Sequence, residues 1–134
     1  IAEVAGVSFI DDSKATNIGA TEAALQGLAG SINGKLILIA GGDAKGADLS
    51  ELAPVLSAYV DVVIALGKDG RVLSDIAAHG FYVESLEQAV QQAFSLAEPG
   101  DTVLLSPACA SLDMFKNYQH RAEVFQQAVE ELSA

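Results

Sequence analysis

The stretch Lys35–Ala40, KLILIA, decides the fold because its last five residues, Leu36–Ala40, form an unbroken apolar run, and turn residues lie on both sides of the stretch. Asn33-Gly34 comes before it, and Gly41-Gly42 follows directly. A strand with one face in water alternates apolar and polar residues, whereas a strand covered on both faces is apolar throughout. We therefore predict a buried strand of a parallel sheet that has helices on both faces.

Segments typical of strands and of helices alternate along the rest of the chain. Further strands are expected at Ile1–Val4, Val7–Ile10, Val60–Leu66, Phe81–Val83 and Thr102–Ser106. Helices are expected at Thr21–Leu28, Asp48–Tyr59, Arg71–His79, Ser85–Ala97 and Asn117–Leu132. This order predicts a Rossmann-like three-layer α/β domain, with a mostly parallel six-stranded sheet, one antiparallel edge strand and about five helices.

Short local signals predict how several of these elements begin and end. Ala5-Gly6 is typical of a tight antiparallel hairpin between the first two strands. Asp48 and Ser85 are of the residue types that accept hydrogen bonds from the free amides of a helix N-terminus. Gly80 is expected to end the preceding helix in a left-handed conformation.

Composition excludes several classes of protein. A chain of 134 residues that is 51% hydrophobic and 19% charged has enough apolar side chains for one folded domain. A net charge of −11, with only seven Lys and Arg, argues against nucleic acid or a membrane surface as partner. The apolar runs are too short to span a bilayer, and the opening residues predict no signal peptide. The single cysteine, Cys109, excludes an internal disulfide and indicates a reducing cytoplasm.

Most of the positive charge is expected at one edge of the sheet. In an open parallel sheet, ligands bind beyond the carboxyl ends of the strands. The connections that leave those ends are Asp11–Asn17, Gly41–Asp48, Gly67–Gly70 and Ser106–Ser111. The cations that lie in or just after them are Lys14, Lys45, Lys68, Arg71 and Lys116, which leaves out only Lys35 and Arg121. Together with helix N-termini on the same edge, they predict a site for an anion such as a carboxylate or a phosphate.

Taken singly, two of these loops leave alternatives open. Gly41–Gly46 is rich in glycine but matches neither a Walker A loop nor the dinucleotide-binding fingerprint. It is therefore either an anion-binding loop or a flexible corner with a solvated lysine. Asp11–Lys14 is either part of the site or a loop whose aspartates cap the next helix.

The remaining reactive side chains carry weaker signals. Cys109 is expected to pack as a small hydrophobic residue rather than act as a nucleophile, because no motif links a histidine to its loop. His79 and His120 are expected at the surface, and their spacing does not predict a metal site. Phe115 and Tyr118 are either core or lid residues.

Three motifs in these loops resemble the C-terminal domain of the Mur ligases. They are Asp12–Asn17 (DSKATN), Gly41–Lys45 (GGDAK) and Leu105–Asn117 (LSPACASLDMFKN). The resemblance extends over nearly the whole chain and is closest to the family members that add D-glutamate. Ala44, where Gly is common, and Tyr118, where many relatives have Phe, depart from the family pattern.

The resemblance implies a cytoplasmic, ATP-dependent ligase of peptidoglycan synthesis. In that family, with ATP and Mg²⁺, the carboxylate of UDP-N-acetylmuramoyl-L-alanine is phosphorylated, and the amine of D-glutamate then attacks the acyl phosphate. A tetrahedral intermediate collapses to the amide, with release of ADP and phosphate. The C-terminal domain brings D-glutamate to the reaction and closes over ATP, which is bound mainly by a central domain.

The resemblance also implies which residues of this chain meet D-glutamate. Lys45 would pair with one of its carboxylates, and Tyr118 would line its pocket. Thr16, Ser111 and the backbone at Leu112 would hydrogen-bond the same ligand. A cation with several fixed donors suits a dicarboxylate, because charge-assisted hydrogen bonds are the strong ones.

On the ATP side, Asp12 and Lys14 would face the ribose and phosphates, and Asn17 would support their loop. No catalytic residue and no metal ligand is implied within residues 1–134, because the family's UDP-binding and ATPase domains have no counterpart in them. Since the chain begins at Ile1 rather than Met, we expect a monomeric third domain cut from a longer enzyme. Alone it would be inactive, with at most weak affinity for D-glutamate or ATP.

Three other functions remain as alternatives. A phosphoacceptor receiver module also carries aspartates after a first central strand. It needs a further aspartate and a lysine where Gly67-Lys68 and Ser106-Pro107 stand. A stand-alone nucleotide-binding module would respond to ATP or NAD at Gly41–Lys45 and not to D-glutamate. A purely structural docking role also fits the sequence.

Overall fold

The structure is a computed structural model, and it describes residues 2–133. Ile1, with which the first predicted strand begins, lies outside the described residues. The strands are β1 (Ala2–Val4), β2 (Val7–Asp11), β3 (Leu36–Gly41), β4 (Val62–Leu66), β5 (Gly80–Tyr82) and β6 (Thr102–Leu105). The α-helices are α1 (Ile18–Leu28), α2 (Ala53–Tyr59), α3 (Gly70–Ile76), α4 (Leu86–Leu96) and α5 (Tyr118–Leu132). Two short 3-10 helices, Ala29–Ser31 and Leu49–Leu52, complete the described elements.

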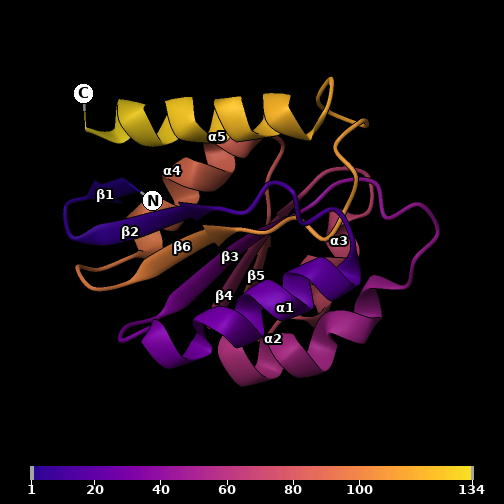
Figure 1. The fold of residues 1–134 in the computed structure, drawn as a ribbon, viewed down its shortest axis with the longest axis horizontal. Coiled ribbons are helices and arrows are strands. Elements are labelled where there is room, and N and C mark those ends of the chain that lie inside the picture. The colour runs from indigo at the N-terminus through magenta and orange to yellow at the C-terminus, as the bar shows by residue number, and fades with distance from the viewer. Residues whose placement is uncertain (1, 134) are drawn as a thin grey trace.

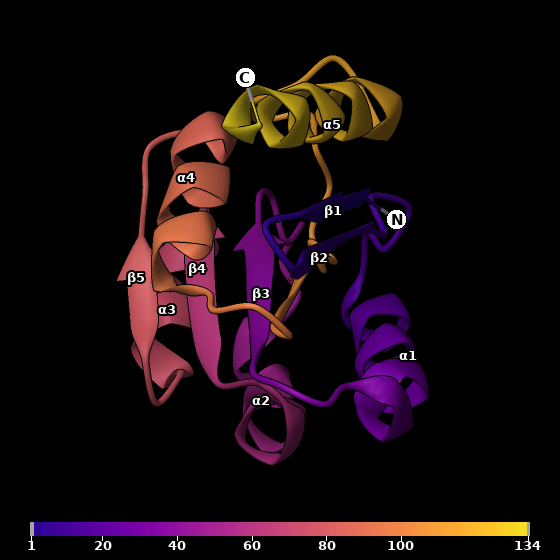
Figure 2. The same cartoon turned by 90° about the vertical axis from the view of Figure 1, so that its left-hand side faces the viewer.

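The strands form one six-stranded sheet in the order β1-β2-β6-β3-β4-β5. Only the β1–β2 pair is antiparallel, and the other neighbouring strands run parallel (Figure 2). The predicted sheet, with its antiparallel strand at one edge, is therefore confirmed. Because β6 is inserted between β2 and β3, the last strand of the chain lies at the middle of the sheet.

Helices cover both faces of the sheet, so that every residue of β3 is buried. Helices α4 and α5 lie on one face, while α1, α2 and α3 pack on the other (Figures 1 and 2). Ile37 and Ile39 belong to the core under α4 and α5, whereas Leu36 and Leu38 belong to the opposite core. Successive residues of a strand point to opposite faces, which is why Leu36–Ala40 has to be apolar throughout.

Two helix starts differ from the prediction for local reasons. α1 begins three residues earlier than expected, because the Asn17 side chain accepts a hydrogen bond from Ala20 N and caps the helix. The segment expected as one helix from Asp48 begins as the 3-10 helix and continues as α2 only from Ala53. Pro54 lies in the first turn of α2, and it has no N–H with which to continue the preceding turn.

The prediction for Gly80 is wrong. α3 ends at Ile76, and Gly80 is the first residue of β5 rather than a left-handed helix stop. A Cβ at this position would lie 2.1 Å from the carbonyl oxygen of Ser74. The glycine is therefore needed for the close approach of β5 to α3 and not for an unusual backbone conformation.

The longest described helix, α5, has 15 residues, whereas about 20 apolar residues are needed to span a bilayer. No helix over residues 2–133 is both long enough and apolar enough to cross a membrane.

Candidate functional site

Four loops meet at the carboxyl ends of the parallel strands, on the right-hand side of Figure 1. We call this edge the rim, and it is formed by residues 11–17, 41–48, 67–70 and 106–117. Backbone hydrogen bonds join its loops: Ala108 N donates to Ala15 O at 2.9 Å, and Gly41 N donates to Pro107 O at 3.0 Å. Asp43 and Ala110 exchange two more bonds, of 3.1 and 2.8 Å. The rim is thus one connected structure, as the sequence predicts.

Lys45 lies at the tip of the loop after β3, with its side chain exposed. Its backbone has φ +51°, in the left-handed region that non-glycine residues rarely adopt. Asp43 stabilises this turn, because its carboxylate accepts from Lys45 N at 2.9 Å. Gly41 and Gly42 are required just before it: a Cβ on Gly41 would lie 1.9 Å from Leu66 O. This loop is therefore held in place and is not a flexible corner.

The loop after β2 is ordered by its aspartates and does not use them as helix caps. Asp12 accepts from the Ser106 hydroxyl at 3.0 Å, which ties the loop to the end of β6. Asp11 accepts from Ser13 N and from Gln126 Nε2 on α5, both at 3.0 Å. The alternative in which these aspartates cap the next helix is wrong, since Asn17 caps α1.

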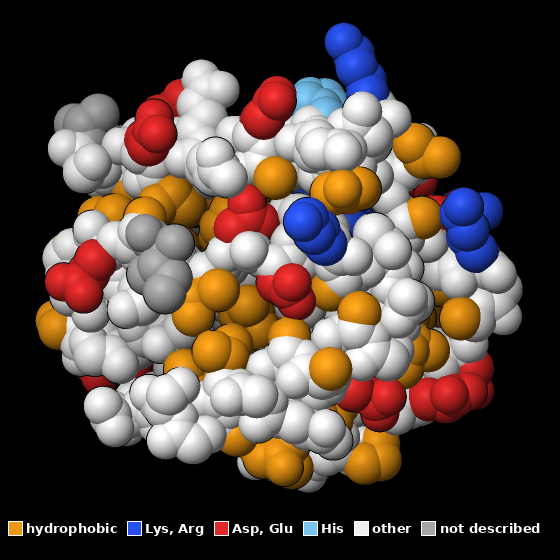
Figure 3. Space-filling view, viewed as in Figure 1, with side chains coloured by type: hydrophobic (Ala, Val, Ile, Leu, Met, Phe, Trp, Pro, Cys, Tyr) orange, Lys and Arg blue, Asp and Glu red, His pale blue; other side chains and the backbone are white. Residues whose placement is uncertain are grey.

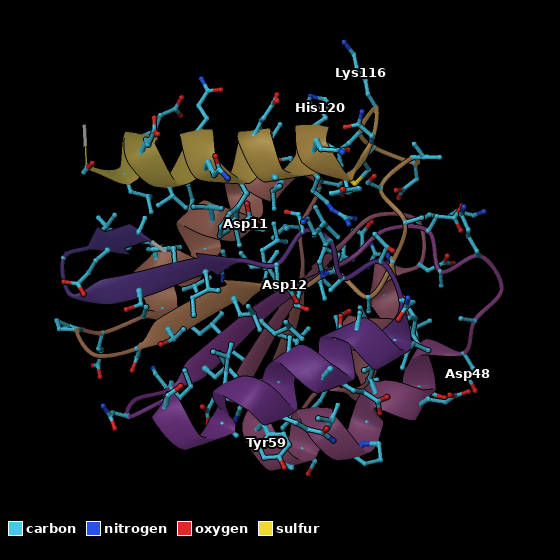
Figure 4. The ribbon with its side chains drawn as sticks, viewed as in Figure 1. Asp11, Asp12, Asp48, Tyr59, Lys116 and His120 are labelled. Carbon is cyan, nitrogen blue, oxygen red and sulfur yellow. The ribbon has the colours of Figure 1, made fainter. Side chains whose placement is uncertain are left out.

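A groove of about 510 Å³ separates this loop from the first turns of α5. Its lining residues are Asp11, Asp12, Ser13, Lys14, Tyr118, Gln119, Ala122 and Glu123. Figure 4 shows Asp11 below α5 and Asp12 between α5 and α1. Tyr118 therefore shares a groove with Asp12 and Lys14, whereas Lys45, Thr16 and Ser111 do not line it.

The segment after β6 combines buried and exposed residues. Ser111 is buried and its carbonyl accepts from Phe115 N at 2.8 Å, while the Leu112 side chain is 64% exposed. Phe115 packs against the core under α5, which decides in favour of a core position. His120 is partly exposed at the surface, as expected, and its ring lies edge-on to Phe115 at 5.5 Å. His79 is exposed as predicted.

Arg121, on α5, holds two loops of the rim and was missed by the sequence prediction. Its guanidinium is buried and donates from Nη1 to Cys109 O at 3.1 Å and from Nη2 to Ser13 O at 3.0 Å. Burial lowers the pKa of this arginine from its ordinary value. The missed signal is its position: Arg121 is four residues before Phe125, on the same helical face that packs on the sheet.

Cys109 packs in the core and is not a nucleophile. Its side chain is fully buried, and burial, followed by the charge of Asp69, raises the pKa of the thiol to about 12. The attacking form of cysteine is the thiolate, which is scarce at neutral pH when the pKa is so high.

The cations of the rim differ in how they are held. Arg71 stacks on the Tyr82 ring at 4.0 Å, and Lys68 Nζ lies 4.0 Å from Asp43 Oδ1. Within residues 2–133, Lys14, Lys45 and Lys116 have no carboxylate within ion-pair distance. The Lys and Arg side chains on the face shown in Figure 3 all lie on its right-hand half, the side of the rim. The charges of Lys14, Lys45 and Lys116 are available to an anion. Residues 2–133 contain no cluster of three side chains that could hold a metal ion.

Comparison with known sequences shows which protein family this chain resembles. Residues 1–109 match the family model "Mur ligase, glutamate ligase domain". A UDP-N-acetylmuramoylalanine–D-glutamate ligase from Methylobacillus flagellatus is 53% identical over 98% of this chain, and one from Pseudomonas aeruginosa is 49% identical over 99%. The chain covers 29% and 30% of the length of these two relatives.

Solved structures share the fold at low sequence identity. A domain of a ligase from Haemophilus ducreyi, described as a putative UDP-N-acetylmuramate:L-alanyl-gamma-D-glutamyl-meso-diaminopimelate ligase, superposes with a TM-score of 0.62 at 18% identity, covering 98% of this chain and 92% of that one. The MurF ligase from Thermotoga maritima, solved in complex with ADP, gives a TM-score of 0.63 at 18% identity. It is covered over 30% of its length, and this chain over 97%.

Proposed function

Because this chain belongs to the Mur ligase family, we propose that it is the C-terminal domain of a ligase that joins D-glutamate to UDP-N-acetylmuramoyl-L-alanine. The chain spans less than a third of the length of the relatives that are named as this ligase. We therefore assign the complete reaction to a longer protein that contains this chain. In that protein we propose that these residues receive the incoming amino acid and approach ATP held by other domains. We also propose that this protein works in the cytoplasm, where ATP is available.

One observation carries the proposal: a free lysine and several fixed donors meet at one rim. Lys45 is exposed and forms no ion pair within the described residues, and the Asp43–Ala110 bonds join its loop to the segment that contains Ser111. The Ala108–Ala15 bond joins that same segment to the loop that contains Thr16. A small dicarboxylate needs this combination of one cation with several donors on different sides.

The roles that follow are specific. Lys45 pairs with a carboxylate of D-glutamate, and Thr16, Ser111 and the backbone of Leu112 supply hydrogen bonds. In the reaction, the substrate carboxylate attacks the γ-phosphorus of ATP and ADP departs. The D-glutamate nitrogen then attacks the acyl carbon, and phosphate leaves as the nitrogen loses a proton. The residues of this chain orient the amine and hold the carboxylates away from the reacting carbon.

The groove beside α5 suits the sugar of ATP better than its phosphates. Lys14 is its single cation, and Asp11, Asp12 and Glu123 place three carboxylates around it. Carboxylates accept hydrogen bonds from ribose hydroxyls and repel phosphate, so Asp12 would face the ribose and Lys14 the nearest phosphate. Tyr118 shares this groove, and there it can contact either ligand. No described residue of this chain is assigned to Mg²⁺.

The test joins this chain to the upstream residues of its ligase and measures phosphate release with UDP-N-acetylmuramoyl-L-alanine and D-glutamate. Lys45→Ala is expected to abolish ligation while changing stability by less than about 1 kcal/mol, because the side chain is exposed. Lys35→Ala is the matched control, since Lys35 lies at the opposite edge of the sheet and pairs with Asp101. An unchanged rate and KM for D-glutamate in Lys45→Ala would contradict the proposal.

Affinity of the short chain gives a second test. We propose that residues 1–134 alone bind D-glutamate weakly, because the opposite wall of the pocket belongs to other domains. Isothermal titration with D-glutamate and with L-glutamate measures this directly. A nanomolar dissociation constant for the isolated chain would contradict it.

A further inference from the structure

Asp69, in the loop after β4, holds the Lys45 loop at two points. Its backbone N–H donates to Gly42 O at 2.9 Å, and its carboxylate Oδ2 accepts from Ala44 N at 2.8 Å. One residue therefore brackets Gly42–Ala44, the segment directly before Lys45. The neighbouring backbones are in contact here, because a Cβ on Gly67 would lie 2.7 Å from Gly42 Cα.

The Asp69 carboxylate serves this loop and not its own helix. Asp69 is the N-cap residue of α3, a position at which aspartate normally accepts from the free amides of the first turn. Its side chain forms no such bond with α3. The side chain that would cap the helix instead satisfies Ala44 N, in a loop 25 residues earlier in the chain.

The loop that contains Asp69 is itself anchored. Gly67 O accepts from the Tyr82 hydroxyl at 3.0 Å, and Arg71 stacks on that same tyrosine ring at 4.0 Å. On the other side, Lys68 N donates to Asp113 Oδ2 at 2.9 Å. Asp69 is therefore held in place relative to β4 and β5, and its two hydrogen bonds fix the Lys45 loop relative to those strands.

The opposite edge of the sheet contains the same pair of hydrogen bonds at the start of a buried strand. Asp61, just before β4, donates from its N–H to Leu36 O at 2.9 Å and accepts from Leu36 N at 2.9 Å with Oδ2. Both aspartates therefore clamp a neighbouring segment by one backbone bond and one carboxylate bond. Asp61 fixes the first residue of a buried strand, whereas Asp69 fixes a loop that ends in an exposed lysine.

We propose that Asp69 is a positioning residue, which fixes Gly42–Ala44 so that Lys45 presents its ammonium to a carboxylate of the amino-acid substrate. The inference rests on the proposed function of the rim and adds a residue that no motif identifies. Lys45 has a left-handed backbone conformation that a neighbouring contact has to maintain. Without Asp69, the amide of Ala44 loses its partner, and the tip of the loop can relax to ordinary backbone angles.

The experiment uses the full-length ligase that contains this chain, with the variants Asp69→Ala, Asp69→Ser, Asp69→Asn and Asp61→Ala. Asp69→Ala is expected to raise the KM for D-glutamate about tenfold with a smaller change in kcat, the size expected for one lost hydrogen bond to a charged group. Asp69→Ser can still cap α3 but is too short to reach Ala44, so it should behave like Asp69→Ala. Asp69→Asn keeps an oxygen acceptor in place and should restore most of the affinity. Asp61→Ala should leave the KM unchanged.

Amide hydrogen exchange provides a readout that does not depend on turnover. Exchange at Ala44 and Lys45 should accelerate in Asp69→Ala and Asp69→Ser, and should stay at the wild-type rate in Asp61→Ala. In Asp61→Ala, the amide that responds should be that of Leu36. Each clamp is thereby tested at the residue that it holds.

The possible results separate the two proposals. If the wild-type enzyme releases no phosphate in response to D-glutamate, the proposed function fails, and with it the substrate named for Lys45. If the wild type turns over but Asp69→Ser restores the KM, or Asp61→Ala raises it equally, Asp69 acts only on stability and the inference is overturned. Unchanged exchange at Ala44 in Asp69→Ala would overturn the clamp itself.

Discussion

The two edges of the sheet, at the carboxyl and the amino ends of its parallel strands, use similar hydrogen bonds for different purposes. At the second of these, which we call the amino edge, residues 5–6, 33–35 and 98–101 form short connections. Asp101 there accepts from Lys35 N and from Glu98 N, both at 2.9 Å, and its carboxylate lies 3.7 Å from Lys35 Nζ. At the rim, longer loops are joined to one another instead, and Lys14, Lys45 and Lys116 remain without ion pairs among the described residues.

This difference indicates which edge of the sheet can bind an anion. The cation at the amino edge is neutralised by a partner that also closes a turn, so no charge is left for a ligand. At the rim, aspartates accept from backbone amides, and within residues 2–133 three lysines have no ion pair, although the chain as a whole has a net charge of −11. Free cations beside fixed backbone amides make an anion-binding surface.

Glycines provide the strongest test of this comparison, because both edges have glycines with positive φ. Gly41 at the rim (φ +132°) would place a Cβ 1.9 Å from Leu66 O, whereas Gly100 at the amino edge (φ +97°) has open space around it. We expect Gly41→Ala to destabilise the domain by more than about 4 kcal/mol and Gly100→Ala by about 1–2 kcal/mol, the cost of the backbone conformation alone. Chemical denaturation followed by circular dichroism measures both. Equal losses would show that crowding at the rim does not constrain the loop.

The sequence predicted the elements of this comparison better than their contacts. The apolar run Leu36–Ala40 and the hairpin turn Ala5-Gly6 are local signals, and both were correct. Asp69 and Arg121 were missed because Asp69 reaches a loop 25 residues away, and Arg121 joins Cys109, 12 residues away, to Ser13, 108 residues away, across strands whose order periodicity does not reveal. β6 has to lie between β2 and β3 before Cys109 and Ser13 can share one guanidinium.

The same limit applies within the candidate site. Lys14, Lys45 and Ser111 were expected at one rim, because loops that leave the carboxyl ends of parallel strands lie at one edge, and the structure places them there. Their roles toward D-glutamate and ATP stay predictions that no contact in this chain decides. Tyr118 illustrates why: its place in the groove with Lys14 depends on how α5 begins, which the helical pattern gives only to within a few residues.

The next largest effect on the free energy of unfolding should come from comparing a buried cation, Arg121, with a partly exposed one, Lys35, at the other edge of the sheet. Arg121→Ala would leave the buried carbonyls of Ser13 and Cys109 without donors, and we expect a loss of about 3 kcal/mol in the free energy of unfolding. Lys35→Ala should lose less than about 1 kcal/mol, because its ammonium is partly exposed and screened by water. Urea denaturation of the two variants compares them directly. Arg121→Lys should recover only part of the loss, since an ammonium lacks the planar geometry that reaches two carbonyls at once.

If Arg121→Ala were no more destabilising than Lys35→Ala, the rim loops would be held by their backbone bonds alone. That result would also predict normal hydrogen exchange at the Ala108 amide in the variant. Accelerated exchange there, with an unchanged rate at Lys35 N, would locate the loss at the rim.

The smallest expected effect is an alkaline one, and it too should come from the rim. Burial, followed by the charge of Asp69, raises the pKa of the Cys109 thiol from 9.0 to about 12. The folded protein therefore keeps a proton that the unfolded chain releases above about pH 9, so stability falls as the pH rises through that range. By about pH 10 the loss should be about 1.4 kcal/mol, and Cys109→Ala should lose this part of the pH dependence. Denaturation of both proteins at a series of pH values isolates the thiol, since tyrosines and lysines contribute equally to the two curves. Parallel curves would mean that the thiol has the same pKa in the folded and unfolded chain, and that the rim opens to water at Cys109.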